Sequence, residues 1–214
     1  MNKRNIERYE AKPIPVPISE NLEGAEVFSP FGPMILKSKA PESLVRRMNQ
    51  YANTNPRTQG ACEFLLTNEQ CMDGGEDSLI RYTGSLIQTY IFHIDNLKIA
   101  SVDFEAFWIV NQTAQTSSPT HFHSCPIAGI LYLQTPTLAD GAEDGNYMLG
   151  RNAGYINFLH GGNQQFSKSI ASFRPVVGDI YIFPGWLLHV AEPFLGTGTR
   201  RSLAFNAKPQ FQVR

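Results

Sequence analysis

The second half of the chain alternates short apolar runs with glycine and proline, and this pattern limits the folds that it can adopt. Between Val102 and Val110, apolar residues occupy every second position around Asp103 and Glu105, which is the period of a half-buried strand. That apolar face consists of Val102, Phe104, Ala106, Trp108 and Val110. Further short apolar runs follow, separated by turn residues such as Pro136, Gly161 and Gly178. Many short strands of this kind predict a β-sandwich or barrel.

The first half contains two amphipathic segments. A helix is predicted from about 41 to 53, where Pro41 suits a first turn and Leu44, Met48 and Tyr51 recur at helical spacing. A second helix is predicted from about 76 to 95 by one apolar stripe, made of Leu79, Tyr82, Leu86, Tyr90 and Ile94.

The rest of the first half has weaker signals. The run from Ala25 to Lys37 predicts one or two short strands around a turn. Residues 53–75 are rich in Asn, Thr, Gly and Gln without a sustained period, so we expect a long loop there. Pro13, Pro15 and Pro17 favour an extended lead-in.

Together these elements predict a mainly β fold with N-terminal α structure. We expect a jelly roll with two helices packed on one outer face. The length of 214 residues suits a single domain. Within it, residues 1–97 would form an N-terminal extension with the two helices, and residues 98–208 the jelly-roll core.

Composition narrows the possible partners and compartments. The net charge is −1 and no block of like charges occurs, so nucleic acid is not expected as a general partner. No stretch has the length and apolarity of a signal peptide or a membrane span. Three cysteines in no metal-binding spacing, Cys62, Cys71 and Cys125, fit a reducing compartment. We therefore expect a cytoplasmic protein.

Three histidines have the arrangement of a metal site. His121 and His123 lie two residues apart in PTHFHSCPIAGILYL (119–133), and residues at i and i+2 of a strand point to the same face. His189 follows a second strand-like run, GDIYIFPGWLLHV. Three neutral imidazoles can bind a first-row divalent ion and leave up to three coordination positions open. Open positions indicate chemistry rather than a structural role.

The segments THFHSCPIAGILYLQTP and GDIYIFPGWLLHVAEPFLGTGTRRSLAFNAK carry a family resemblance. They resemble the catalytic core of the 2-oxoglutarate- and Fe(II)-dependent oxygenases, in particular a subgroup common in phages and marine bacteria. The shared pattern is His-x-His, a strand with a tyrosine, Gly-Asp-x-x-x-Phe-Pro followed by His, and Arg-x-Ser leading into Phe-Asn. The resemblance covers roughly residues 98–208 and implies a double-stranded β-helix, the jelly roll of that family.

The resemblance also implies roles for particular residues. His121, His123 and His189 would be the iron ligands. Arg200 would pair with the distal carboxylate of 2-oxoglutarate, and Ser202, on the same face of its strand, would add a hydrogen bond. Arg201 is the rival cation but would point to the opposite face. Tyr132 matches the strand tyrosine of the family, and either a contact with the cosubstrate or simple packing would explain it.

The implied activity is that of a dioxygenase that hydroxylates an unknown organic substrate while 2-oxoglutarate and O2 become succinate and CO2. Aromatic residues near the histidines would line a dry pocket, with substrate-selecting loops between Leu138 and Ser172. The candidate lining residues are Phe107, Trp108, Phe122 and Trp186, and packing in the core is the alternative expected for most of them. Asp179 is expected to be a turn residue, and His160 a loop residue.

One departure from the family pattern keeps other interpretations open. The broad superfamily has an Asp or Glu where this chain has His123, so the identity of the metal is less certain. A cupin-like three-histidine metalloprotein, acting as a keto-acid-independent oxygenase or an isomerase, is one alternative. A non-enzymatic ligand-binding jelly roll is another. Arg200 and Ser202 favour the oxygenase, because a cupin does not need a buried cation at that position.

Overall fold

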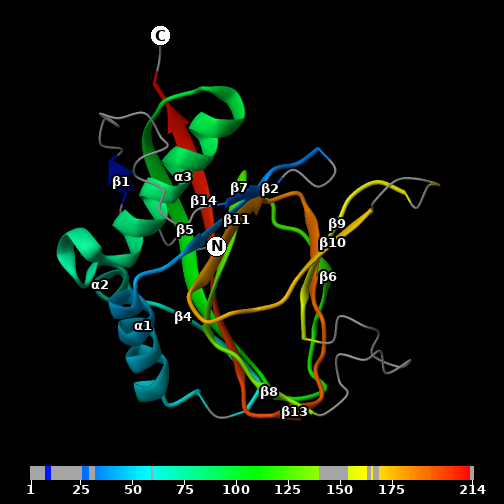
Figure 1. Cartoon of the computed structure of the whole chain (residues 1–214). Helices are drawn as coiled ribbons and strands as arrows, with labels where there is room; N and C mark the ends of the chain where they lie inside the picture. Colours follow the sequence, from blue (N-terminus) through cyan, green and yellow to red (C-terminus); the bar gives the residue numbers. More distant parts are fainter. Residues whose placement is uncertain are drawn as a thin grey trace.

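The computed structural model describes residues 8–10, 26–28, 32–58, 60–139, 154–162, 165 and 169–212. Its largest element is an antiparallel sheet of eight strands in the order β1-β5-β14-β7-β11-β3-β2, with β4 also paired to β5 (Figure 1). The strands are β1 (Arg8–Glu10), β2 (Glu26–Phe28), β3 (Ile35–Lys39), β4 (Cys62–Leu65), β5 (Ile99–Gln112), β7 (Ile127–Gln134), β11 (Asp179–Pro184) and β14 (Arg200–Phe211).

A second antiparallel sheet faces part of the first and completes the jelly roll. Its order is β10-β9-β12-β6, so β6 is an edge strand. These strands are β6 (Ser118–His121), β9 (Ile156–Leu159), β10 (Ile170–Phe173) and β12 (Leu188–Ala191). A short pair, β8 (Thr137–Leu138) with β13 (Gly196–Thr197), lies at one end. Within the predicted substrate-selecting segment between Leu138 and Ser172, the structure describes β9 and the start of β10. Residues 140–153, 163–164 and 166–168, and the proline-rich lead-in around Pro13, Pro15 and Pro17, lie outside the described residues.

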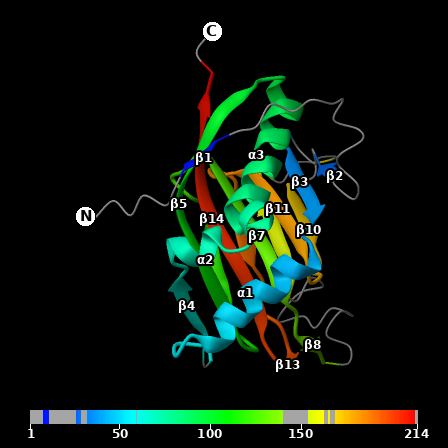
Figure 2. The same ribbon diagram turned by 90° about the vertical axis from the view of Figure 1, so that its left-hand side faces the viewer.

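Two helices cover the outer face of the large sheet (Figure 2). They are α1 (Glu42–Thr54) and α3 (Leu79–Asp95). The Ser78 side chain accepts a hydrogen bond from the Arg81 amide and begins α3, and Asn96 ends it in the left-handed conformation. The prediction of a mainly β fold flanked by two helices is confirmed.

The prediction of a long loop over residues 53–75 is wrong. This segment contains β4 and the helix α2 (Asn68–Met72), followed by a 3-10 turn, η1 (Gly75–Asp77). Thr67 and Gln70 form a reciprocal capping box that stabilises α2. β1 to β4 all lie before residue 98, so the N-terminal part of the chain contributes strands to the large sheet as well as helices.

The single apolar face predicted for 102–110 is also wrong, because β5 contains a bulge. Asn206 pairs with Ala106, and the next residue, Ala207, pairs with Phe104, which leaves Glu105 as the extra residue. Val102, Phe104, Phe107 and Ile109 therefore pack under the helices. After the bulge, Ala106, Trp108 and Val110 point to the opposite face, inside the jelly roll.

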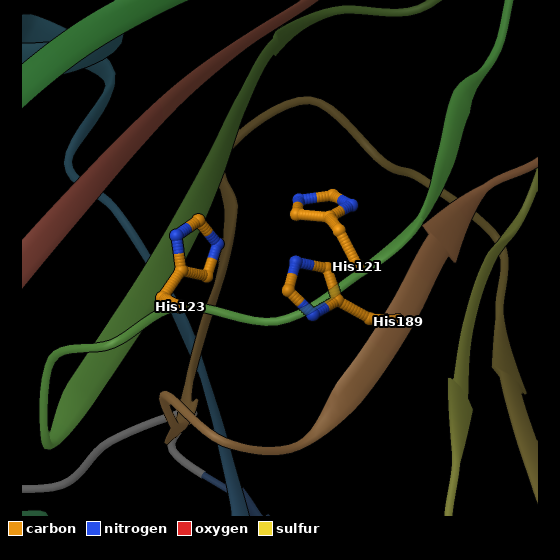
Figure 3. A group of neighbouring side chains, drawn as sticks. All are labelled: His121, His123 and His189. Atoms are coloured by element: carbon orange, nitrogen blue, oxygen red, sulfur yellow. The ribbon is translucent and has the colours of Figure 1, made fainter.

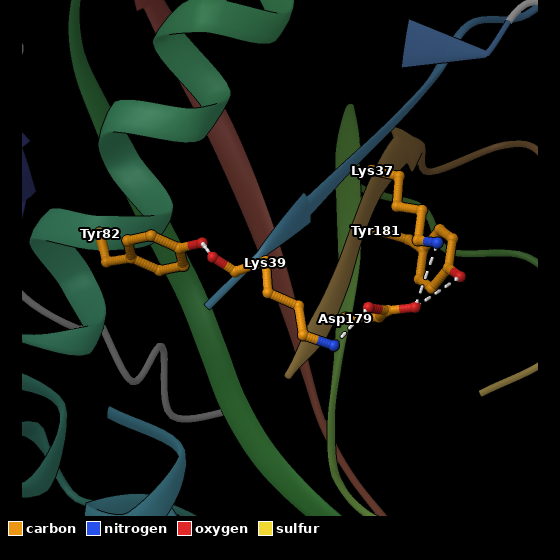
Figure 4. Close-up of polar contacts among 5 residues, drawn as sticks. All are labelled: Lys37, Lys39, Tyr82, Asp179 and Tyr181. Carbon is orange, nitrogen blue, oxygen red and sulfur yellow. Dashed lines mark hydrogen bonds and ion pairs between the residues drawn. The ribbon is translucent and has the colours of Figure 1, made fainter. Parts of the chain in front are cut away.

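Asp179 belongs to β11 itself, and only Gly178 before it has the positive φ of a turn, which corrects the expectation of a turn residue. Its buried carboxylate lies 2.9 Å from Lys39 Nζ and 3.3 Å from Lys37 Nζ (Figure 4). The Tyr82 hydroxyl on α3 donates to the Lys39 carbonyl over 3.0 Å. These contacts tie β11 to β3 and β3 to the helical layer.

A close approach at Gly129 in β7 yields a stability prediction. A Cβ on Gly129 would lie 2.2 Å from the Phe205 ring, which is fully buried. We expect Gly129→Ala to lower the free energy of unfolding by about 1–3 kcal/mol, since overpacking forces neighbouring side chains to shift. Urea unfolding measures this change. The cost should shrink in a Phe205→Leu background, and an equal cost in both backgrounds would contradict the steric explanation.

Candidate active site

The three predicted histidines come together on the inner side of the jelly roll (Figure 3). His121 ends β6 and is the direct cross-strand partner of His189 in β12. His123 lies two residues beyond β6, and one ring nitrogen from each residue falls within 4.8 Å of the others. Two sheet positions and one loop position thus build a three-imidazole cluster that can hold a metal ion.

Backbone contacts prepare two of these rings for metal binding. His121 Nδ1 lies 2.7 Å from the Pro119 carbonyl oxygen, and His189 Nδ1 lies 2.9 Å from that of Leu187. A carbonyl only accepts hydrogen bonds, so each Nδ1 carries the proton and each Nε2 keeps a free lone pair. In both rings the ligand atom is therefore Nε2.

Burial disfavours the protonated, positively charged form of His123 and His189 at neutral pH. It lowers the pKa of His123 to about 4, and the neighbouring His121 acts in the same direction. Burial likewise lowers the pKa of His189 to about 4. Both rings are neutral at pH 7, which is the form that binds metals.

The loop that carries His123 is fixed against a tight turn at Gly185. The His123 amide donates to the Gly185 carbonyl over 2.8 Å, and the Gly185 amide donates to the Pro126 carbonyl over 2.9 Å. A Cβ on Gly185 would lie 1.9 Å from the Cys125 carbonyl oxygen. Only glycine lets the backbone at residue 185 approach the backbone of Cys125 this closely, so Gly185 determines the position of the His123 loop.

Gly185→Ala is therefore expected to displace the His123 loop. We expect a lower melting temperature and about a tenfold weaker metal affinity, comparable to the loss of a supporting contact at a metal site. Calorimetric titration with Fe(II) under anaerobic conditions measures the affinity. Gly162→Ala is the matched control, because a Cβ there meets nothing within 4 Å. Unchanged affinity in Gly185→Ala would contradict this role.

Arg200 is a buried cation with neutral hydrogen-bond partners. Its side chain is 1% exposed. Nε and Nη2 donate to Gln112 Oε1 over 3.0 and 2.9 Å, and Nη1 donates to the carbonyls of Gly154 and Glu192 over 2.8 and 2.7 Å. Among the described residues, no carboxylate pairs with this guanidinium. Burial lowers the pKa of Arg200, and the Glu192 carboxylate opposes this shift without forming an ion pair, so the buried position suits an anionic ligand.

Arg201 points to the opposite face of β14, as the period of a strand predicts. Its guanidinium donates to the side-chain oxygens of Asn111, Asn49 and Asn53, each over 2.9 Å. Asn49 and Asn53 belong to α1, so Arg201 fixes this helix to the sheet. It lies away from the histidine side of the jelly roll.

Tyr132 and Ser202 lie side by side with Arg200. Ser202 pairs with Tyr132 across β14 and β7, and both side chains are buried. The Tyr132 hydroxyl has no hydrogen-bond partner among the described residues. Burial raises the pKa of Tyr132 and the nearby Arg200 opposes that shift. A buried hydroxyl without a partner, next to a buried cation, fits a site for an anion's oxygen atoms.

The aromatic residues predicted to line the pocket, and His160, lie in different parts of the structure. Phe107 lies in the core beneath the helices, so its placement in the pocket was wrong. Trp108 lies inside, with its ring centroid 5.9 Å from that of His123. Phe122 and Trp186 are 63% and 54% exposed, and the His160 ring lies 5.7 Å from that of Trp186. All three therefore lie at the surface near the site.

Sequence reasoning missed Gln112. Gln112 accepts from Arg200 and donates to the Ser118 hydroxyl of β6 over 3.2 Å, so it links the cation to the strand of His121. No motif marks this glutamine. Cys125, two residues beyond His123, packs in the core, and burial raises the pKa of its thiol to about 11.

The described residues combine a jelly roll, three histidines that could hold a metal ion and a buried arginine. Residues 106–206, from β5 to β14, match the family described as "Putative 2OG-Fe(II) oxygenase". This match agrees with the family resemblance of the motifs. No curated protein matches the chain.

Solved structures with a similar fold are known. An oxidoreductase of the 2OG-Fe(II) oxygenase family from Burkholderia pseudomallei has a TM-score of 0.52 at 9% identity, over 81% of this chain and 83% of that chain. A Pseudomonas putida prolyl-4-hydroxylase has a TM-score of 0.51 at 14% identity, over 80% and 91%. HygX from Streptomyces hygroscopicus, with nickel, 2-oxoglutarate and hygromycin B bound, has 0.51 at 11%, over 83% of each chain. At such identities the likeness establishes the fold alone.

Proposed function

We propose that this protein is a dioxygenase that uses Fe(II) and 2-oxoglutarate to hydroxylate an organic substrate. The observation that carries the proposal is Arg200, a fully buried guanidinium with no carboxylate among its described partners, in the jelly roll that also presents the three imidazoles. A cupin-like metalloprotein would not need that cation. O2 and the organic substrate would be its partners, and the free thiols of its cysteines support a cytoplasmic location.

The side chains at the site suit both Fe(II) and 2-oxoglutarate. His121, His123 and His189 would hold Fe(II), since imidazole is a good ligand for this ion. Arg200 would pair with the distal carboxylate of 2-oxoglutarate, while Tyr132 and Ser202 would donate hydrogen bonds to it. When bound, iron and 2-oxoglutarate supply the oxidation of the substrate by O2, with release of succinate and CO2.

The chain's own contribution is orientation and exclusion of water. Gln112 and the carbonyls of Gly154 and Glu192 hold the Arg200 guanidinium in one orientation before any anion arrives. Phe158 and Phe183 pack beside His189, with ring centroids 6.0 and 4.9 Å from its ring, and exclude water from that side. Because a neutral imidazole takes the place of the usual carboxylate, the proposed ligand set carries one negative charge less than a two-histidine, one-carboxylate centre.

We also propose that residues 1–214 form one domain, with an N-terminal extension (1–97) and a core (98–208). The four strands that the extension adds to the large sheet support this organisation. No helix in the described part of the chain has the length and apolarity needed to cross a membrane.

An anaerobic titration of the metal-free protein with Fe(II) and 2-oxoglutarate tests the proposed function. We expect the visible charge-transfer band of a metal-chelated keto acid, and formation of succinate after O2 is admitted. Fe(II) binding without a band would favour the cupin-like alternative. If no metal binds, the enzyme proposal is wrong.

A further inference from the structure

On the inner face of the large sheet, the side chains are buried from solvent at one end, the closed end, and partly exposed at the other, the open end. At the closed end, Arg200, Ser202 and Tyr132 are all buried. Further along the same strands the inward side chains are partly exposed, although they lie on the central strands of the sheet. We call these residues the open floor: Trp108, Ile130, Ala204 and Asn206.

The open floor continues to the edge of the sheet in one row of paired residues. Leu65 pairs with Trp108, Trp108 with Ala204, and Ala204 with Ile130. Leu65 on β4 is 46% exposed. At about 4.8 Å per strand, this row spans roughly 14 Å. An accessible apolar surface of this kind usually binds something, and Trp108 places it against His123.

One polar group in the open floor lacks a partner. The Asn206 side-chain oxygen is buried and accepts no hydrogen bond from the described residues. Such an atom costs free energy unless a ligand supplies a donor. A ligand bound on the open floor would therefore need an N–H or O–H group that donates a hydrogen bond to the Asn206 oxygen.

The margin of the open floor carries negative charge. Glu63 is exposed at the β4 edge, but its partner Val110 pairs with Ser202 at the closed end, so Glu63 lies away from Asn206. Glu105 is the exposed bulge residue next to Ala106, the partner of Asn206. Lys208, two residues beyond Asn206, has the acidic residue Asp103 as its register partner.

We propose that the open floor binds the organic substrate of the proposed function, and that this substrate is an amine with an apolar body. The ammonium group would donate to Asn206 and face Glu105, while the apolar body would pack on Trp108. An indole face attracts cations, and an acidic margin attracts them over a longer range. The body of the amine would then lie beside His123, with its C–H bonds toward the metal centre.

Calorimetric titration with matched probes tests this proposal without requiring turnover. The probes are 2-phenylethylamine, 2-phenylethanol and 3-phenylpropanoate, which share an apolar body and differ in charge, together with tryptamine as a larger amine. We expect both amines to bind more tightly than the alcohol, and the carboxylate to bind most weakly. A tetrapeptide with one lysine shows whether a free amine or a protein side chain is preferred.

Variants locate the site. Asn206→Leu should weaken 2-phenylethylamine binding about tenfold, the scale of a lost hydrogen bond to a charged group. Glu105→Gln should weaken it about two- to fivefold, as an exposed charge does. Glu69→Gln, an exposed acid on α2, is the matched control and should change nothing. Circular dichroism and Fe(II) affinity verify that each variant is folded.

The outcomes separate this proposal from the proposed function. Equal binding of amine and carboxylate, an unchanged affinity in Asn206→Leu, or no binding of either amine overturns the amine site, even if the charge-transfer band forms. Amine binding that depends on Asn206, in a protein that forms no band, supports the amine site and refutes the oxygenase.

Discussion

Replacement of His189 by alanine is expected to weaken Fe(II) binding by more than about a hundredfold, since even contacts that support metal ligands are worth ten- to a hundredfold. His189 is the most buried of the three ring donors, at 7% exposed, and is held by Leu187 and by the facing His121. Two imidazoles on one edge strand and its following loop would not retain the ion. Anaerobic calorimetry with Fe(II) measures the change, and the charge-transfer band should disappear.

Two further variants test whether the loss of Fe(II) binding in His189→Ala is specific to this histidine. His93→Ala removes an exposed histidine at the end of α3 and should leave Fe(II) affinity unchanged. His189→Gly should regain part of the band when free imidazole is added, because the small ligand can fill the space left by the side chain. A band that survives in His189→Ala would exclude this histidine as a ligand.

The second large effect is expected at Arg200. Arg200→Met removes the guanidinium from its buried position, and the KM for 2-oxoglutarate should rise about a hundredfold, as for the loss of one partner of a buried charge pair. Fe(II) affinity in the absence of 2-oxoglutarate should stay near that of the wild type. Succinate formation over a range of 2-oxoglutarate concentrations measures the KM.

The neighbouring arginine provides the contrast. Arg201→Met breaks the bonds to Asn49 and Asn53 on α1, so it should lower the melting temperature while leaving the KM near its wild-type value. Arg200→Lys keeps the charge but loses the planar fork, and an intermediate KM is expected. If Arg201→Met raises the KM instead, the two roles are reversed.

The period of two in β-strands made much of this site predictable. It placed His121 and His123 on one side of the chain, and it assigned Arg200 and Arg201 to opposite faces of their strand. The helices α1 and α3 were predictable because their apolar stripes extend over several turns. Each of these features depends on local spacing, which a sequence displays directly.

Features that depend on distant pairing were not predictable. The bulge at Glu105 reverses the faces of β5, and it follows from the register with β14 about a hundred residues away. β4 spans four residues and forms because the edge of β5 is available to it. The hydrogen bonds of Arg200 to two backbone carbonyls carry no sequence signal, since every residue has a carbonyl.

Pro119 gives β6 protection against association with other chains. β6 is an edge strand of its sheet, and such a strand exposes backbone groups that a strand of another molecule can pair with. Proline has no amide hydrogen to offer, and Pro119 is exposed in the middle of this edge. Its carbonyl is already engaged by His121. Substitution of Pro119 would therefore favour self-assembly through the same strand that carries a candidate metal ligand, so aggregation and loss of metal would arise together.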